Sequence, residues 1–105
     1  MRAAKLKGVW PMQYVVSTIW KHPADMDKDR MREVQAQWRE NGNLVNIYWF
    51  EIDSTTHGSV SIFKSRDAFE ANLALQEEHR KKSTDENRIT MTHEAQGECF
   101  AVLHG

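Results

Sequence analysis

The sequence predicts an α+β domain in which four strands form one antiparallel sheet and two helices pack on one face of it. Segments with strand periodicity and segments with helical periodicity follow in the order strand, helix, strand, strand, helix, strand. The 105 residues suffice for one core but not for two. Hydrophobic residues make up 40% and charged residues 28%, as in a folded globular domain. We therefore expect a single domain over residues 1–105, with residues 1–11 as an N-terminal tail or a short extra strand.

The first strand is predicted at residues 12–20, where β-branched and aromatic residues dominate. The first helix is predicted at residues 26–41, because Asp25 or Asp27 can accept hydrogen bonds from its first amides. Three apolar residues at spacings of three and four fall on one side of it: Met31, Val34 and Trp38. The Asn-Gly pair at 41–42 is typical of a left-handed helix stop.

The strand predicted at Leu44–Ile52 is apolar on both of its faces. One alternation contains Leu44, Tyr48, Phe50 and Ile52, and the other contains Val45, Ile47 and Trp49. Burial of both faces requires a second covering layer, and a chain of this length has no further element to supply it. A second copy of the chain would supply that layer, so the pattern predicts a homodimer.

A turn is predicted at residues 53–58, and the next strand at 58–65. On this strand, Val60 and Ile62 occupy one face, and the opposite face holds Ser59, Ser61 and Phe63.

The second helix is predicted at residues 66–82, with Ser65 as its N-cap. Its apolar arc contains Ala68, Phe69, Leu73 and Leu75, and three polar residues lie within the same arc: Asn72, Gln76 and His79. Polar groups that face a core need hydrogen-bond partners. A polar loop is expected at 83–88, and a last strand or pair of strands at 89–105, with a bulge or bend at Gln96-Gly97.

This order of elements is the ferredoxin-like βαββαβ arrangement. With the segment VSIFKSRDAFEA and a histidine late in the second helix, His79, the chain resembles the dimeric α+β-barrel proteins that include antibiotic-biosynthesis-type monooxygenases. The resemblance covers about residues 12–103. It implies a sheet-to-sheet dimer with a pocket between sheet and helices in each subunit. Where the haem-degrading branch has a tryptophan this chain has Asn72, and that branch's first-strand asparagine has no match near Ser17 and Thr18, so haem degradation is not expected.

The resemblance implies a role for His79 as a pocket base or ligand. An imidazole titrates near pH 6.5, so it could take a proton from a phenol or an enol. Asn72, Gln76, Tyr14 and Tyr48 could orient a substrate or stabilise an oxyanion. One hypothesis is a cofactor-independent oxygenase or isomerase that acts on a small aromatic or polyketide-like molecule. The alternative is a dimer without enzymatic activity that binds a small metabolite or another protein.

Other functional classes are disfavoured. The five histidines have no i, i+2 or i, i+4 spacing, which argues against a metal site; His57, next to Gly58, is interpreted as a turn residue. The net charge of −1 and the lack of basic residues in HGSVSIFKS disfavour nucleic acid. No apolar run would span a membrane or form a signal peptide. Cys99, the single cysteine, is interpreted as a small core residue in a cytoplasmic protein. No cofactor is expected.

Overall fold

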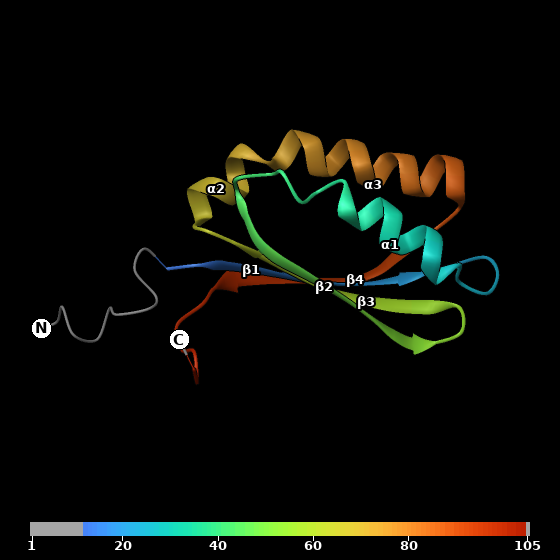
Figure 1. Cartoon of the computed structure of the whole chain (residues 1–105), viewed down its shortest axis with the longest axis horizontal. Helices are drawn as coiled ribbons and strands as arrows, with labels where there is room; N and C mark the ends of the chain where they lie inside the picture. Colours follow the sequence, from blue (N-terminus) through green and yellow to red (C-terminus); the bar gives the residue numbers. More distant parts are fainter. Residues whose placement is uncertain (1–11, 105) are drawn as a thin grey trace, which may run out of the picture.

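The computed structural model describes residues 12–104 and contains one antiparallel sheet with helices on one face (Figure 1). The expectation for residues 1–11 lies outside the described residues. The elements are β1 (Tyr14–Lys21), α1 (Lys28–Ala36), β2 (Leu44–Asp53), β3 (Thr56–Phe63), α2 (Arg66–Ala71), α3 (Leu73–Asn87) and β4 (Thr90–Glu98). The strand order is β2-β3-β1-β4. This confirms the predicted ferredoxin-like fold of the single chain.

The core lies between the centre of the sheet and α2. Tyr14 and Val16 of β1 pack with Phe63 of β3 and Phe69 of α2. Strand β1 pairs with β3 on one side and with β4 on the other, and its helix-facing residues are all buried. The predicted assignment of the β3 side chains to the two faces of the sheet is confirmed, because Phe63 lies on the helix side with Ser59 and Ser61.

The first helix is shorter than predicted. It begins after Asp27, whose Oδ1 accepts a hydrogen bond from the backbone N–H of Arg30 at 3.0 Å. After Ala36 the chain continues in tighter turns with bonds from residue i+3 to residue i. The expected left-handed stop at residues 41–42 is wrong, because neither Asn41 nor Gly42 has a left-handed φ. The one non-glycine residue with positive φ among residues 12–104 is Arg88, which ends α3 at φ 56°.

Two details of the β2–β3 hairpin differ from the prediction. Strand β3 begins at Thr56, so His57 is a strand residue paired with Trp20 and not a turn residue. A bulge near the start of β2 leaves Val45 without a partner. The extra residue reverses the alternation there, so Leu44 faces the helices with Ile47 and Trp49 and not the opposite side with Tyr48.

The predicted second helix is two helices that meet at Asn72, and the second continues to Asn87. The expected loop at 83–88 is therefore mostly helical. The break also changes which residues face inward: Leu73 and Leu75 are exposed, whereas Asn72 is buried. The inward face of α3 is consequently polar, because Gln76 and His79 follow Asn72 along it.

Strand β4 is one strand and not a pair. Its bulge lies at Thr92, where the register with β1 shifts, whereas Gln96 and Gly97 pair regularly with Val16 and Val15.

The sheet face away from the helices is apolar and open in the single chain, and Tyr48 and Phe50 on it are 54% and 51% exposed. Cys99, after β4, is only partly buried and unpaired.

Candidate functional site

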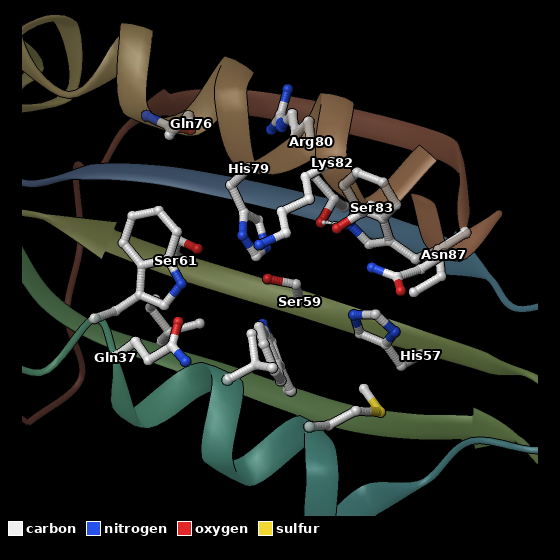
Figure 2. Close-up of a pocket in the computed structure, with 18 of the residues that line it drawn as sticks. Gln37, His57, Ser59, Ser61, Gln76, His79, Arg80, Lys82, Ser83 and Asn87 are labelled. Carbon is white, nitrogen blue, oxygen red and sulfur yellow. Dashed lines mark hydrogen bonds between the residues drawn. The ribbon is translucent and has the colours of Figure 1, made fainter. Parts of the chain in front are cut away.

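A cavity of about 350 Å³ lies between the sheet and the helices α1 and α3, and Figure 2 shows its lining. We call it the sheet–helix cavity. Strands β1, β2 and β3 form its floor, and aromatic side chains contribute much of the wall: Trp20, Trp38, Trp49 and Phe63. The predicted α1 stripe is confirmed, because Met31, Val34 and Trp38 all line this cavity. Its size and aromatic lining are typical of a small-molecule site.

Asn72, at the break between α2 and α3, presents an oriented hydrogen-bond donor in the cavity lining. The backbone N–H of Asn43 donates to Oδ1 of Asn41, which leaves Nδ2 of Asn41 to donate to Oδ1 of Asn72 at 2.7 Å. The amide orientation of Asn72 is thereby fixed. Its Nδ2 is buried without a partner, and the side chain does not cap α3. A buried amide donor without a partner costs free energy that a ligand oxygen would recover.

Gln76 and His79 continue the polar face of α3 beyond Asn72. The Nε2 atom of Gln76 is also buried without a partner. The His79 imidazole extends from α3 toward β3 (Figure 2), and its ring meets that of Trp38 edge to face at a centroid distance of 5.2 Å. Burial, and then the nearby charges of Arg80 and Lys82, lower the pKa of His79 below its ordinary value. The imidazole is therefore neutral at pH 7 and has a free lone pair to accept a proton.

A pair of imidazoles, His22 and His57, lies elsewhere in the lining of the cavity. Nε2 of His22 and Nδ1 of His57 are 2.8 Å apart, and the two ring centroids are 5.0 Å apart. These distances place the two nitrogens directly toward one another, as in a hydrogen bond. Burial, and then the neighbouring His22, lower the pKa of His57 to about 4. The ring of Trp49 lies 5.5 Å from that of His57.

The structure brings together three of the five predicted site residues. Asn72, Gln76 and His79 line the sheet–helix cavity, and Tyr14 and Tyr48 do not. Tyr14 packs on Phe69 in the core, and its hydroxyl donates to Oε1 of Gln96 at 2.8 Å. Tyr48 lies on the open face of the sheet, since strand side chains alternate and its neighbours Ile47 and Trp49 face the helices.

Sequence reasoning missed the His22–His57 pair and the tryptophans of the wall. The two histidines are 35 residues apart, and only the antiparallel pairing of β1 with β3 brings them together. A signal was present: His22 follows β1 directly and His57 lies near the start of β3, and antiparallel pairing places the opposite ends of two strands side by side. The interpretation of His57 as a turn residue prevented the prediction of this pair. Within residues 12–104, no group of three or more histidine, cysteine, aspartate or glutamate residues could hold a metal ion.

No protein-family model matches this sequence, and no curated protein is significantly similar to it. Solved structures are similar in fold. An alanine variant of SnoaB, a cofactor-independent oxygenase from Streptomyces nogalater, matches with a TM-score of 0.69 and 9% identity over 89% of this chain and 98% of SnoaB. ActVA-Orf6, a monooxygenase from Streptomyces coelicolor in complex with nanaomycin D, matches with a TM-score of 0.61 and 12% identity over 88% and 91% of the two chains.

A protein of unknown function from Nitrosomonas europaea, NE2512, has the same fold with a TM-score of 0.55 and 9% identity over 87% of this chain and 93% of that one. At these identities the likeness shows a shared fold. It confirms the expected architecture, the ferredoxin-like α+β fold of monooxygenases such as SnoaB. Among the helices of the described part of the chain, none is long and apolar enough to cross a membrane.

Proposed function

We propose that this protein is a cofactor-independent oxygenase that oxidises a small hydroxylated aromatic molecule in the sheet–helix cavity. The observation that carries the proposal is the polar lining at Asn72 and along α3: a neutral imidazole and two residues whose amide donors have no partner line one cavity that also has aromatic walls. The likeness in fold to a cofactor-independent oxygenase, SnoaB, supports the same class of reaction.

In this proposal His79 is the general base. It removes the proton of the substrate hydroxyl, because its lowered pKa leaves it neutral at pH 7. The resulting phenolate supplies electrons to dioxygen, which is the oxidant. One oxygen atom forms a new C–O bond at a ring carbon that loses its hydrogen, and the other leaves as water, so that a phenol and O₂ give a quinone and H₂O.

Asn72 and Gln76 would hold the phenolate oxygen. A phenolate develops negative charge where the hydroxyl was neutral, so donors that point at this oxygen stabilise the charged form more than the neutral one. Asn72 is suited to this role because Asn41 and the backbone of Asn43 hold its amide in one orientation. A donor that does not have to reorient stabilises the developing charge at little cost.

We further propose that the protein acts as a homodimer joined through the open face of its sheet. Tyr48, Phe50 and Ile52 form an apolar row there, each about half-exposed in the single chain. After β4, Phe100 and Leu103 are 89% and 91% exposed, which adds apolar surface that a second copy would cover. Sedimentation equilibrium at micromolar concentration should give twice the mass of the chain, and a monomeric mass would contradict the proposal.

The oxygenase proposal is tested by dioxygen consumption with a panel of naphthols and dihydroxynaphthalenes. The His79→Gln variant should lose at least about a hundredfold in rate, as expected for a general base, while its melting temperature stays close to that of the wild type. Glu78→Gln is the matched control, because Glu78 precedes His79 on α3 and is exposed. Binding of the naphthols without oxygen consumption would favour the alternative, a dimer that binds a metabolite without enzymatic activity.

A further inference from the structure

The floor of the sheet–helix cavity contains two buried hydroxyl groups, on Thr18 of β1 and Ser59 of β3. Both residues line the cavity, and they are 5% and 7% exposed. They are partners in the pairing of β1 with β3, so their side chains lie directly opposite one another on the helix-facing side of the sheet. A strand residue at such a position is usually apolar, because a buried hydroxyl needs a hydrogen-bond partner.

The Thr18 hydroxyl is oriented as a hydrogen-bond donor. Nε1 of Trp20, two residues further along the same face of β1, donates to Thr18 Oγ1 at 2.8 Å. An indole N–H can only donate, so it occupies an acceptor position of the hydroxyl and leaves the hydroxyl hydrogen for another group. Among residues 12–104, neither Thr18 nor Ser59 donates its hydroxyl hydrogen to any acceptor. Two donors are therefore available to a molecule in the cavity.

The two hydroxyls can reach a single acceptor atom. Directly opposite residues of an antiparallel pair have Cβ atoms about 4.5 to 5.5 Å apart. A hydroxyl donor lies about 2.7 Å from its acceptor oxygen, so an oxygen atom between the two side chains can accept from both. Figure 2 shows Ser59 on β3, facing the imidazole of His79 that extends from α3. Such an oxygen atom would lie on the His79 side of the sheet.

The proposed reaction develops negative charge at two places, and the amides account for one of them. Asn72 and Gln76 are assigned to the phenolate oxygen, and their Nδ2 and Nε2 atoms are the buried donors there. Reduced dioxygen is the second anion. It needs donors at a different point of the same cavity, and the hydroxyl pair on the floor provides them.

We propose that Thr18 and Ser59 bind dioxygen as it is reduced, and that both hydroxyls donate to its terminal oxygen. The inference rests on the proposed function, because it assigns the residues that hold the second reactant. One electron passes from the phenolate to O₂ and gives an aryloxyl radical and superoxide. These combine at a ring carbon, which forms the new C–O bond and leaves the negative charge on the terminal oxygen of a peroxide.

The remaining steps return one proton and remove another. His79 gives the phenol proton to the terminal oxygen and then takes the hydrogen of the same ring carbon as a proton. The electrons of that C–H bond form the C=O bond, and the O–O bond breaks. The terminal oxygen leaves as hydroxide, still bound by Thr18 and Ser59, and accepts the proton from His79 to become water. A phenol and O₂ thus give a quinone and H₂O.

The experiment measures how much of the consumed dioxygen ends in quinone and how much in hydrogen peroxide. The substrates are 1-naphthol and 1,5-dihydroxynaphthalene. Thr18→Val and Ser59→Ala should each lower the rate of quinone formation by roughly a hundredfold, as for the loss of one oriented donor to a developing oxyanion. Superoxide that is no longer held should escape and dismutate, so hydrogen peroxide should replace quinone as the main product of dioxygen in both variants.

Ser61→Ala is the matched control. Ser61 has the same side chain on the same face of β3, but its partner on β1 is Val16, so no second hydroxyl lies opposite it. This variant should keep the wild-type ratio of quinone to hydrogen peroxide. Binding of 1-naphthol without oxygen, followed by quenching of tryptophan emission, should be unchanged in Ser59→Ala, because the hydroxyl contacts dioxygen and not the phenol.

Thr18→Val removes the acceptor of Trp20 Nε1, so this variant should also lose stability. Ser59→Ala leaves that bond intact and should keep the melting temperature close to that of the wild type. It therefore separates the effect on the reaction from an effect on folding.

A wild-type ratio of quinone to hydrogen peroxide in Ser59→Ala would overturn the inference and leave the oxygenase function in place. An equal loss of quinone in Ser61→Ala would also overturn it. A wild-type protein that consumes no dioxygen with either substrate would contradict the proposed function, and the inference with it.

Discussion

Acid should destabilise this protein through His57, which is buried near the start of β3 and hydrogen-bonded to His22. Its pKa is about 4 in the folded protein, compared with 6.5 for an unperturbed histidine. At a pH between these two pKa values, His57 is protonated in the unfolded chain and neutral in the folded chain. Lowering the pH therefore favours unfolding, and the stability present above pH 6.5 is lost as the pH falls to about 4.

The size of the effect follows from the shift in pKa. One unit corresponds to about 1.4 kcal/mol, so the difference between 6.5 and about 4 amounts to roughly 3 kcal/mol in the free energy of unfolding. This is a substantial part of the total stability of a domain of this size. Asparagine at position 57 cannot titrate but keeps an amide near the position of Nδ1, so His57→Asn should remove the contribution of His57 and retain a partner for His22.

The assay is urea unfolding, followed by circular dichroism at one protein concentration, from pH 7.5 down to pH 4. The wild type should lose about 3 kcal/mol more than His57→Asn over this range. An asparagine substitution at His93, which is exposed on β4, controls for the loss of a histidine elsewhere on the sheet. Parallel stability curves for the wild type and His57→Asn, or an NMR titration of the His57 ring near pH 6.5, would refute the reasoning.

Further predictions concern the core, a helix cap, a helix end and the open face of the sheet. Phe63→Ala should lower the free energy of unfolding by about 3 to 5 kcal/mol, because Phe63 is the most buried large side chain within the described residues; a loss below about 1 kcal/mol in urea would contradict this. Ser65→Ala should cost about 1 kcal/mol in the same assay, since Ser65 Oγ accepts the backbone N–H of Ala68. Arg88→Gly should raise the melting temperature, because Arg88 has a positive φ that glycine adopts without strain, and a lower one would disagree. Phe50→Lys should shift the sedimentation mass toward the monomer with an unchanged circular dichroism spectrum, whereas an unchanged dimer would exclude this face as the interface.

Local signals in the sequence were enough to predict most of the fold. The β-branched and aromatic residues of β1 and β2, the N-cap residues Asp27 and Ser65, and the stripe on α1 each predicted an element that the structure contains. These signals depend on neighbouring residues along the chain, so they can be interpreted without knowledge of tertiary contacts. Element ends were less certain, because bulges and tight turns change the alternation by a single residue, as at Val45.

The sequence by itself determined the order of strands and helices and three residues of the candidate site, since Asn72, Gln76 and His79 share a face of the predicted second helix by periodicity alone. Tertiary structure decided the rest. The pairing of β1 with β3 brings His22 to His57, the turn before β2 brings Asn41 to Asn72, and the alternation of β2 directs Trp49 into the cavity and Tyr48 away from it. The reason is physical: these contacts join residues about thirty or more positions apart or depend on strand register, which the packing of the whole sheet against its helices sets.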